Sequence, residues 1–182
     1  MPKELNNEQQ EKEKSLQDSL FEAVRNDDLN SVKKAISEGA NVNARDSEEM
    51  TPLHLATIFE NKEIVNELLN HQADPNAKNE TGNTPLHFAA EASNLELLKL
   101  LVEKGGDVDA VNEDNWSVIH SVASGIVNKK ENWEIVRLLI SKGVNVEVIA
   151  DNGFSVYDVF CGKDRSYAEH YAQIVEVYHK GK

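Results

Sequence analysis

The sequence contains little cysteine and no long apolar run. Its only cysteine, Cys161, has no partner for a disulfide within the 182 residues and is typical of a reducing compartment. No stretch approaches the about 18 apolar residues of a membrane-spanning helix, and residues 1–17 lack the apolar core of a signal peptide. We therefore expect a cytoplasmic protein that does not insert into a membrane, although secretion without a cleaved signal would leave the same pattern.

Positive charge is also scarce. The 19 lysines and arginines are outnumbered by 32 aspartates and glutamates, which gives a formal net charge of -13. A surface of this sign repels phosphate groups, so we expect no nucleic acid partner and no anionic lipid partner. The hydrophobic fraction of 40% is nonetheless sufficient to bury a core. The composition therefore indicates a folded chain whose partner is neither a nucleic acid nor an anionic lipid.

An internal repeat dominates what the sequence does contain. Thr-Pro-Leu-His at residues 51–54 recurs 33 positions later at residues 84–87, and a weaker copy, Ser-Val-Ile-His, follows after another 33 at residues 117–120. A further copy, Ser-Val-Tyr-Asp, lies at residues 155–158. Counting 33 residues back from the first copy, at Thr51, reaches Asp18. A fixed period of this length indicates a repeat architecture in which neighbouring units share a core.

The 33-residue period and the pattern T-P-L-H-x-A, present at residues 51–56 and 84–89, resemble the ankyrin repeat family. The resemblance covers roughly residues 18 to 180. It implies an all-α fold, a solenoid of stacked helix-turn-helix units with β-hairpin-like fingers, whose atypical first and last units act as caps. The expected repeat domain, residues 18–182, divides into units near residues 18–50, 51–83, 84–116, 117–154 and 155–182.

Local signals agree with these units. Thr51 and Thr84 are good N-caps, and the proline after each loses no hydrogen bond at the first helical position. We predict the same capping role for Asp18, Ser117 and Ser155. Apolar pairs four residues apart in the second helices predict one buried stripe, for example at Leu68, Leu101 and Leu139. The residues after the second helices, where a left-handed conformation is needed, are Gly39, Gln72, Gly105 and Gly143.

The finger segments have a turn position that favours a positive φ. Gly82 and Gly153 suit this position, and Asn115 is a tolerable substitute. Glu49 is the exception. We therefore expect the finger before Thr51 to be the least regular.

The ends and the later units depart from the pattern. Residues 1–17 are charged, rich in glutamine and glutamate, and nearly free of large apolar groups, so we expect a disordered or frayed helical tail. Units four and five carry extra residues between their helices, within residues 125–132 and 162–167. Tolerated surface loops are the ordinary interpretation of such insertions, and a second contact point for a partner is the alternative. Asp158 replaces the motif histidine, which suits a terminal unit.

The six histidines do not indicate a metal or catalytic site. The resemblance implies that His54, His87 and His120 form hydrogen bonds between fingers. No pair of histidines has the i, i+4 spacing with an acidic companion that a zinc protease helix needs. The three remaining histidines, which we expect to face solvent, are His71, His170 and His179.

Cys161 lies between Asp158 and His170, an order that superficially matches a catalytic set. A nucleophile needs an oriented base and an oxyanion pocket, and the surrounding residues suggest neither. The sequence also lacks a glycine-rich phosphate loop. We predict no catalytic residue, no metal and no cofactor, and therefore no enzyme activity.

The resemblance places a partner on the concave surface formed by the fingers and the first helices. Large apolar groups occur there, and carboxylates recur in every finger, which favours a partner with a basic or mixed apolar surface. Trp116 and Phe154 have the alternative of folding back onto adjacent fingers, and Trp133 is expected to pack. The residues predicted to contact the partner are Met50, Ile58, Phe59, Glu80, Asn83, Glu91, Glu113, Trp116, Asp151 and Phe154.

These observations favour a monomeric protein-binding adaptor or inhibitor. The alternative is a structural module that self-associates or is part of a larger complex. A composition rich in asparagine, lysine and glutamate is compatible with an AT-rich bacterium living inside host cells, where such a protein would act as an effector.

Overall fold

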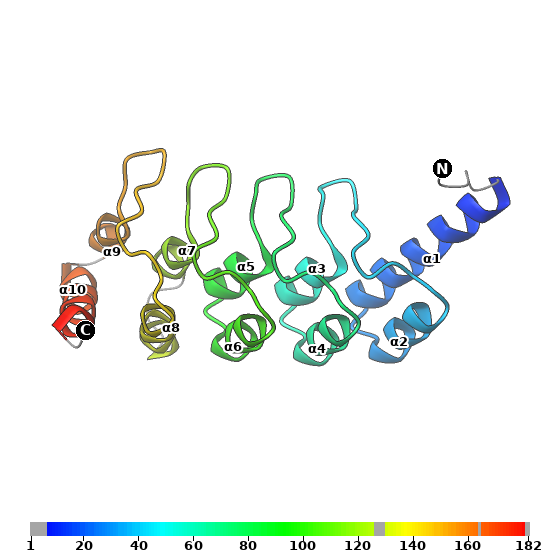
Figure 1. Cartoon of the computed structure of the whole chain (residues 1–182), viewed down its shortest axis with the longest axis horizontal. Coiled ribbons are helices and arrows are strands. Elements are labelled where there is room, and N and C mark those ends of the chain that lie inside the picture. The colour runs from blue at the N-terminus through cyan, green and yellow to red at the C-terminus, as the bar shows by residue number, and fades with distance from the viewer. Residues whose placement is uncertain (1–6, 126–129, 164, 181–182) are drawn as a thin grey trace. The chain divides into compact units, whose positions relative to one another are not determined.

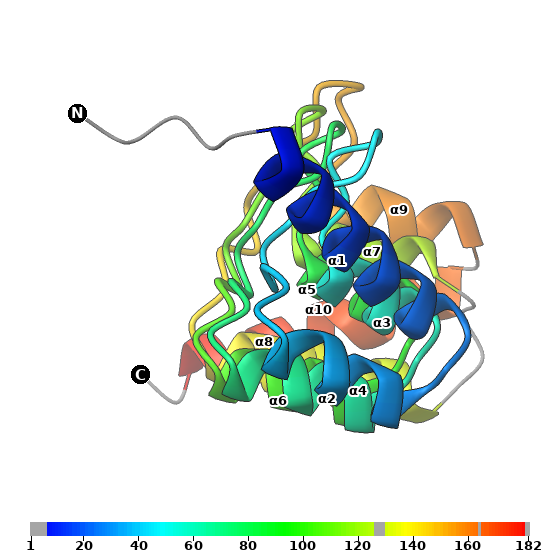
Figure 2. The same cartoon turned by 90° about the vertical axis from the view of Figure 1, so that its right-hand side faces the viewer.

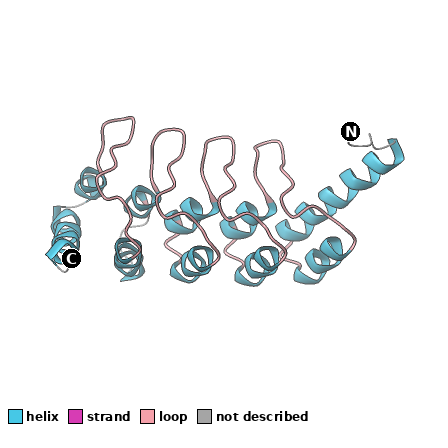
Figure 3. Cartoon of the chain, viewed as in Figure 1, coloured by secondary structure: helices cyan, strands magenta, loops and turns pink. Residues whose placement is uncertain are grey.

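The computed structural model describes residues 7–125, 130–163 and 165–180, and within these ranges it contains ten helices and no strand (Figure 1, Figure 3). The chain divides into two units, Met1–Asp74 and Pro75–Lys182. In each unit a first helix is followed by a second helix, and a finger loop then leads to the next first helix. This architecture confirms the predicted all-α repeat fold.

The first unit consists of two helix pairs. Its helices are α1 (Asn7–Arg25), α2 (Leu29–Ser37), α3 (Pro52–Ile58) and α4 (Lys62–Asn70). α1 contacts α3 in one layer, and α2 lies beside α4 in the other (Figure 2). Leu20, Leu53 and Leu68 are fully buried. Burial of apolar area of this kind, worth about 25 cal/mol per Å², is the main term that holds the layers together.

The first helix begins earlier than the repeat pattern predicts. α1 runs from Asn7, and residues 9–15 are exposed on it. Asp18 therefore lies inside a helix, and the prediction that it is an N-cap is wrong. The glutamine, glutamate and lysine of this segment are good helix formers, which explains why the helix continues without a buried face. Of the two states expected for this segment, a disordered tail or a frayed helical one, the structure shows a helix from Asn7 onward.

The second unit has three helix pairs. Its helices are α5 (Pro85–Glu91), α6 (Leu95–Glu103), α7 (Val118–Ser124), α8 (Lys130–Ser141), α9 (Val156–Lys163) and α10 (Arg165–Lys180). α5, α7 and α9 contact one another in order in one layer, and α6, α8 and α10 do so in the other. Leu101 and Leu139 are fully buried, as the stripe predicts, and Leu86 of the first helix α5 is fully buried as well.

Three first helices begin with a hydroxyl–imidazole pair. The backbone N–H of the capping residue donates to histidine Nδ1 in each case. Because Nδ1 accepts, the proton of the neutral ring lies on Nε2. This geometry confirms the predicted N-caps. The distances between the hydroxyl oxygen and Nδ1 are 2.8 Å for Thr51 and His54, 2.9 Å for Thr84 and His87, and 2.6 Å for Ser117 and His120.

At the start of α9, the carboxylate of Asp158 takes the place of the imidazole. The backbone N–H and the hydroxyl of Ser155 donate to Asp158 Oδ2 at 2.9 and 2.6 Å, and the N–H of Asp158 donates to Ser155 Oγ at 3.2 Å. The hydrogen bonds from Ser155 lower the pKa of the Asp158 carboxyl. The predicted cap at Ser155 is confirmed, with Asp158 in the role of the ring nitrogen.

The finger before Thr51 is as regular as the others, so the expectation for Glu49 is wrong. Asp46 Oδ1 accepts the backbone N–H groups of Glu48 and Met50. In the next finger, Asn79 Oδ1 accepts the N–H groups of Thr81 and Asn83 in the same way. Glu49 adopts φ 57°, in the left-handed region where Gly82 has φ 78°. The side-chain bonds of the turn therefore impose this conformation at a cost of about 1–2 kcal/mol for a residue with a Cβ.

The residues after the second helices are left-handed, as predicted. Gly39, Gly105 and Gly143 have φ of 100°, 95° and 86°, and Gln72 reaches 67°. At Gln72 the Cβ makes the left-handed conformation sterically unfavourable, whereas glycine adopts it without strain.

Aromatic side chains close the C-terminal part of the second unit. The ring of Trp133 lies 5.3 Å from Phe160, 5.9 Å from Tyr167 and 4.4 Å from His170, centroid to centroid. Trp133 therefore packs, as expected, but His170 lies against it rather than simply facing solvent. The extra residues of unit four lie largely outside the described residues, as do Asp164 of unit five and the side chain of His179.

Candidate functional site

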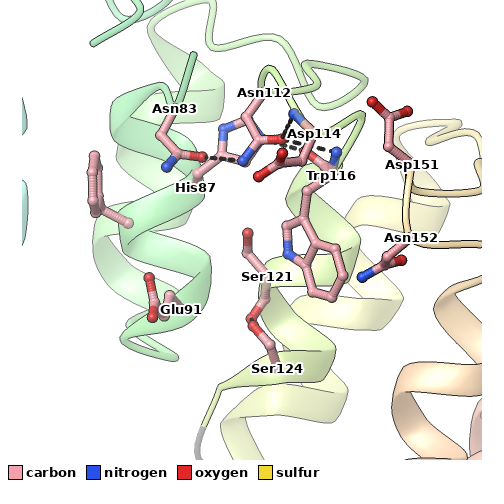
Figure 4. A pocket seen from close by; sticks show the side chains of 11 residues that line it. Asn83, His87, Glu91, Asn112, Asp114, Trp116, Ser121, Ser124, Asp151 and Asn152 are labelled. Atoms are coloured by element: carbon pink, nitrogen blue, oxygen red, sulfur yellow. Dashed lines mark hydrogen bonds between the residues drawn. The ribbon is translucent and has the colours of Figure 1, made fainter. Parts of the chain in front are cut away.

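The second unit contains a groove with a volume of about 490 Å³ on the side formed by the fingers and the first helices (Figure 4). Helices α5 and α7 and three consecutive fingers contribute to it. The lining residues are Asn83, His87, Phe88, Glu91, Asn112, Asp114, Trp116, Ser121, Ser124, Asp151 and Asn152.

The motif histidines hold the fingers over the first helices. His87 Nε2 donates to the carbonyl of Trp116 at 3.1 Å, and His120 Nε2 donates to the carbonyl of Phe154 at 3.3 Å. Each ring thus caps its own helix through Nδ1 and reaches the following finger through Nε2. The inter-finger role implied by the family resemblance is confirmed for these two histidines. Burial lowers the pKa of the His120 ring.

Direct bonds between fingers complete the support. Asn112 Nδ2 donates to Asn83 Oδ1 at 3.0 Å, and the N–H of Asp151 donates to the carbonyl of Asp114 at 2.9 Å. Asn115 Nδ2 also donates to the carbonyl of Ile149 at 2.7 Å. The groove therefore lies on a surface whose loops are fixed by hydrogen bonds to their neighbours, and it does not depend on a partner to form.

Trp116 combines the two alternatives predicted for it. Its ring is half-buried and lies 4.9 Å from His120 with a tilt of 40°. The same ring lines the groove, with Ser121 on one side of it and Asn152 on the other in Figure 4. The side chain thus packs against the capped end of α7 and still offers surface to the groove.

The groove is acidic. Glu91, Asp114 and Asp151 are exposed and line it, whereas no lysine or arginine is among the described lining residues. Carboxylates on several elements make the local electrostatic potential more negative.

Four of the predicted contact residues meet in this groove: Asn83, Glu91, Trp116 and Asp151. Three others on the same fingers do not line it. Glu80 and Glu113 are exposed there, and Phe154 is 53% exposed. These three are exposed on the fingers but are not among the residues that line the groove.

The predicted contact residues of the first unit are of two kinds. Ile58 and Phe59, at the end of α3, are 41% and 51% exposed, as expected. Met50 is only 5% exposed, so its predicted place on the contact surface is wrong. Its side chain is apolar and flexible, and burying it removes more apolar area from water than leaving it on the finger surface would.

The prediction missed two groove residues on the first helices, Phe88 and Ser121. Phe88 and Ser121 occupy the variable fifth position of the motif, directly after the histidine. Because the histidine side chain turns inward to cap the helix, the next residue points to the finger side. That position could have identified both residues.

Among the described residues, Cys161 forms no hydrogen bond with a histidine or an aspartate. Cys161 is exposed, and the Asp158 carboxylate is engaged by Ser155. Among the described residues no group of three histidine, cysteine, aspartate or glutamate side chains is arranged to hold a metal ion. None of the helices in the described ranges has the length and apolar character needed to span a membrane.

Helix pairs joined by ordered fingers define a helical repeat protein. Residues 20–112 match the family model for ankyrin repeats in three copies. The chain belongs to the ankyrin repeat family, whose members are general protein–protein interaction modules and typically not enzymes. No curated protein matches the sequence.

Proposed function

We propose that this chain is a protein-binding adaptor or inhibitor, that it holds its partner on the fingers and first helices, and that it catalyses no reaction. The groove in the second unit is the observation that supports this function most directly, because it joins a half-buried aromatic ring to carboxylates on a rigid support. Buried aromatic rings commonly anchor protein interfaces. The acidic surroundings favour a partner with a basic or mixed apolar surface.

The energetics require more than one anchor. Full burial of about 150–250 Å² of an aromatic ring contributes about 4–6 kcal/mol, whereas association costs about 4–15 kcal/mol. Trp116 alone is insufficient. Phe154, which is exposed in the same unit as Trp116, is the candidate for a further contact there, and Ile58 and Phe59 are exposed candidates in the first unit taken by itself.

Affinity capture with the purified chain tests this proposal. Wild type is compared with Trp116→Ala, with Phe154→Ala and with the double variant, and Glu103→Ala serves as the control because Glu103 is an exposed residue of α6 that does not line the groove. We expect a partner that the control retains, that Trp116→Ala loses and that Phe154→Ala retains less well. Equal recovery by all variants would remove the groove from the binding surface.

A second candidate function is self-association. A hollow of about 350 Å³ between α8 and α10 is lined by Arg137, Ile140, Ser141, His170, Gln173, Ile174 and Val177, and Val177 is 72% exposed. Exposed apolar surface of this kind favours contact with another protein surface. Light scattering separates the two functions, since a cytoplasmic adaptor is expected to be a monomer and a self-associating module a defined oligomer.

A further inference from the structure

We propose that the groove of the second unit binds the guanidinium group of an arginine in an extended segment of the partner protein. This inference rests on the proposed binding function and specifies the chemistry that the groove recognises. Three features of the groove support it: the arrangement of its carboxylates, the indole ring of Trp116 and the hydroxyl of Ser121.

The carboxylates surround the groove from different elements. Glu91 ends α5, Asp114 lies on one finger and Asp151 lies on the next. In the described part of the chain none of the three forms an ion pair or a side-chain hydrogen bond, so their oxygens remain available as acceptors. Guanidinium has five N–H donors in a fixed plane and can therefore bond to carboxylates on two sides at once, whereas an ammonium group is a point charge.

Trp116 provides an aromatic face for the same group. One side of its ring packs against His120, and the remainder is open to the groove. A guanidinium plane stacks on an indole ring through cation–π attraction, for which tryptophan is the best of the aromatic residues. The ring and the carboxylates thus favour the same ligand group for independent reasons.

Ser121 adds a hydroxyl at this point of the groove. The residue is only 6% exposed, and its hydroxyl has no hydrogen-bond partner among the described residues. Figure 4 shows its side chain in the groove near the indole ring of Trp116. The Ser121 oxygen is not among the buried side-chain atoms that lack a partner, so water solvates it in the free protein, and an incoming N–H donor would replace that water.

The other ligand classes fit less well. An anion would meet three carboxylates. A metal ion needs at least three suitable ligands at short distance, and no such group occurs in the described residues. A purely apolar side chain would leave the Ser121 hydroxyl and the nearby carboxylates desolvated without a partner. The volume of about 490 Å³ admits one long side chain together with part of its backbone.

The indole N–H signals of the two tryptophans test this inference in the intact chain. The ¹⁵N-labelled protein is titrated with a capped Gly-Gly-Arg-Gly-Gly peptide and, separately, with the same peptide carrying citrulline or lysine. We expect the arginine peptide to shift the Trp116 signal, assigned with Trp116→Phe, and not the Trp133 signal. Replacement by neutral citrulline should weaken binding at least about tenfold, because the charge-assisted bonds are lost.

Variants locate the interaction. Asp114→Asn with Asp151→Asn should weaken the arginine peptide about tenfold or more, while the matched control Glu103→Gln, on exposed α6 surface away from the groove, should change nothing. Ser121→Ala should produce a smaller loss, and thermal unfolding confirms that each variant is folded.

Specific outcomes would overturn the inference. Equal binding of citrulline would exclude a charged ligand, equal binding of lysine would exclude recognition of the guanidinium plane, and the absence of any Trp116 shift would exclude the site. If the arginine peptide fails while affinity capture still depends on Trp116, the protein-binding function stands and only the arginine specificity is lost. If neither experiment depends on Trp116, both proposals fail.

Discussion

The second unit contains two kinds of first helix. α7 begins with Ser117 and His120, and α9 begins with Ser155 and Asp158. His120 uses both ring nitrogens, one to cap its own helix and the other to reach the carbonyl of Phe154 on the next finger. The carboxylate of Asp158 performs only the capping function. The comparison teaches that one side chain joins local helix initiation to the link between units, and that these two roles are separable.

Removal of the imidazole should have the largest effect. His120 is fully buried, so His120→Ala leaves the N–H of Ser117 and the carbonyl of Phe154 without their partners and creates a cavity. We expect a loss of about 2–4 kcal/mol in the free energy of unfolding. Urea unfolding followed by circular dichroism measures it. Asp158→Ala should shift the midpoint less, and equal shifts would contradict the comparison.

His120→Asn keeps the helix cap but not the bond to the next finger. Its loss of stability should fall between those of His120→Ala and Asp158→Ala. The amide oxygen of His120→Asn can accept the N–H of Ser117 but cannot reach Phe154, so we expect a loss of about 1–2 kcal/mol. Amide exchange should accelerate in the finger that contains Gly153 more than in α7 itself. If exchange accelerates equally in both, the helix cap and the finger bond are not separable in this side chain.

The parts of the fold that follow from neighbouring residues were predictable from the sequence. The caps at Thr84 and Ser117 depend on a hydroxyl and a histidine three residues apart, and Gly143 supplies a left-handed conformation at a fixed place. The start of α1 at Asn7 was not predictable from the repeat, because it depends on helix propensity in a segment without a buried face.

The groove was only partly predictable, since it depends on which way side chains point after the repeats stack. The position before each motif places Trp116 and Met50 at equivalent points of their fingers, yet one lines a groove and the other is buried. Equivalence in the repeat specifies a backbone position and not a side-chain direction. Ser121 and Asp151 are 30 positions apart in the sequence, and only the packing of α7 beneath the fingers brings them to one site.

The stability contributions of the His120 cap and the Asp158 cap should be lost in different pH ranges. An unfolded histidine titrates near 6.5, and burial lowers the pKa of His120 below that value, opposed by its bond to Phe154. The unfolded state therefore binds the proton first, and stability falls as pH decreases from about 6.5 through the folded pKa. We expect His120→Asn to lose less stability than wild type between pH 7.5 and about 5.5, measured by urea unfolding at each pH.

The Asp158 carboxyl acts in a lower window. Hydrogen bonds from Ser155 hold its pKa below the usual 3.8, so its contribution is present above that pH and is lost as pH falls through the folded pKa. The difference between wild type and Asp158→Ala should therefore stay constant from pH 7.5 to about 5. A difference that already changes near pH 6 would show that the two caps are coupled.

Asp158→His, which gives α9 the kind of cap found on α7, should have the smallest effect on the free energy of unfolding. In Asp158→His the ring nitrogen Nδ1 can accept the N–H of Ser155, so the start of α9 is retained. The new Nε2, however, has no carbonyl of a following finger to bond, because α10 follows α9 in the described chain without another finger. Residue 158 is exposed, so water solvates this nitrogen at little cost. We expect an unchanged urea midpoint at pH 7.5. A stabilisation as large as the loss in His120→Asn would contradict the comparison, because the histidine would then be stabilising its helix without any finger to hold.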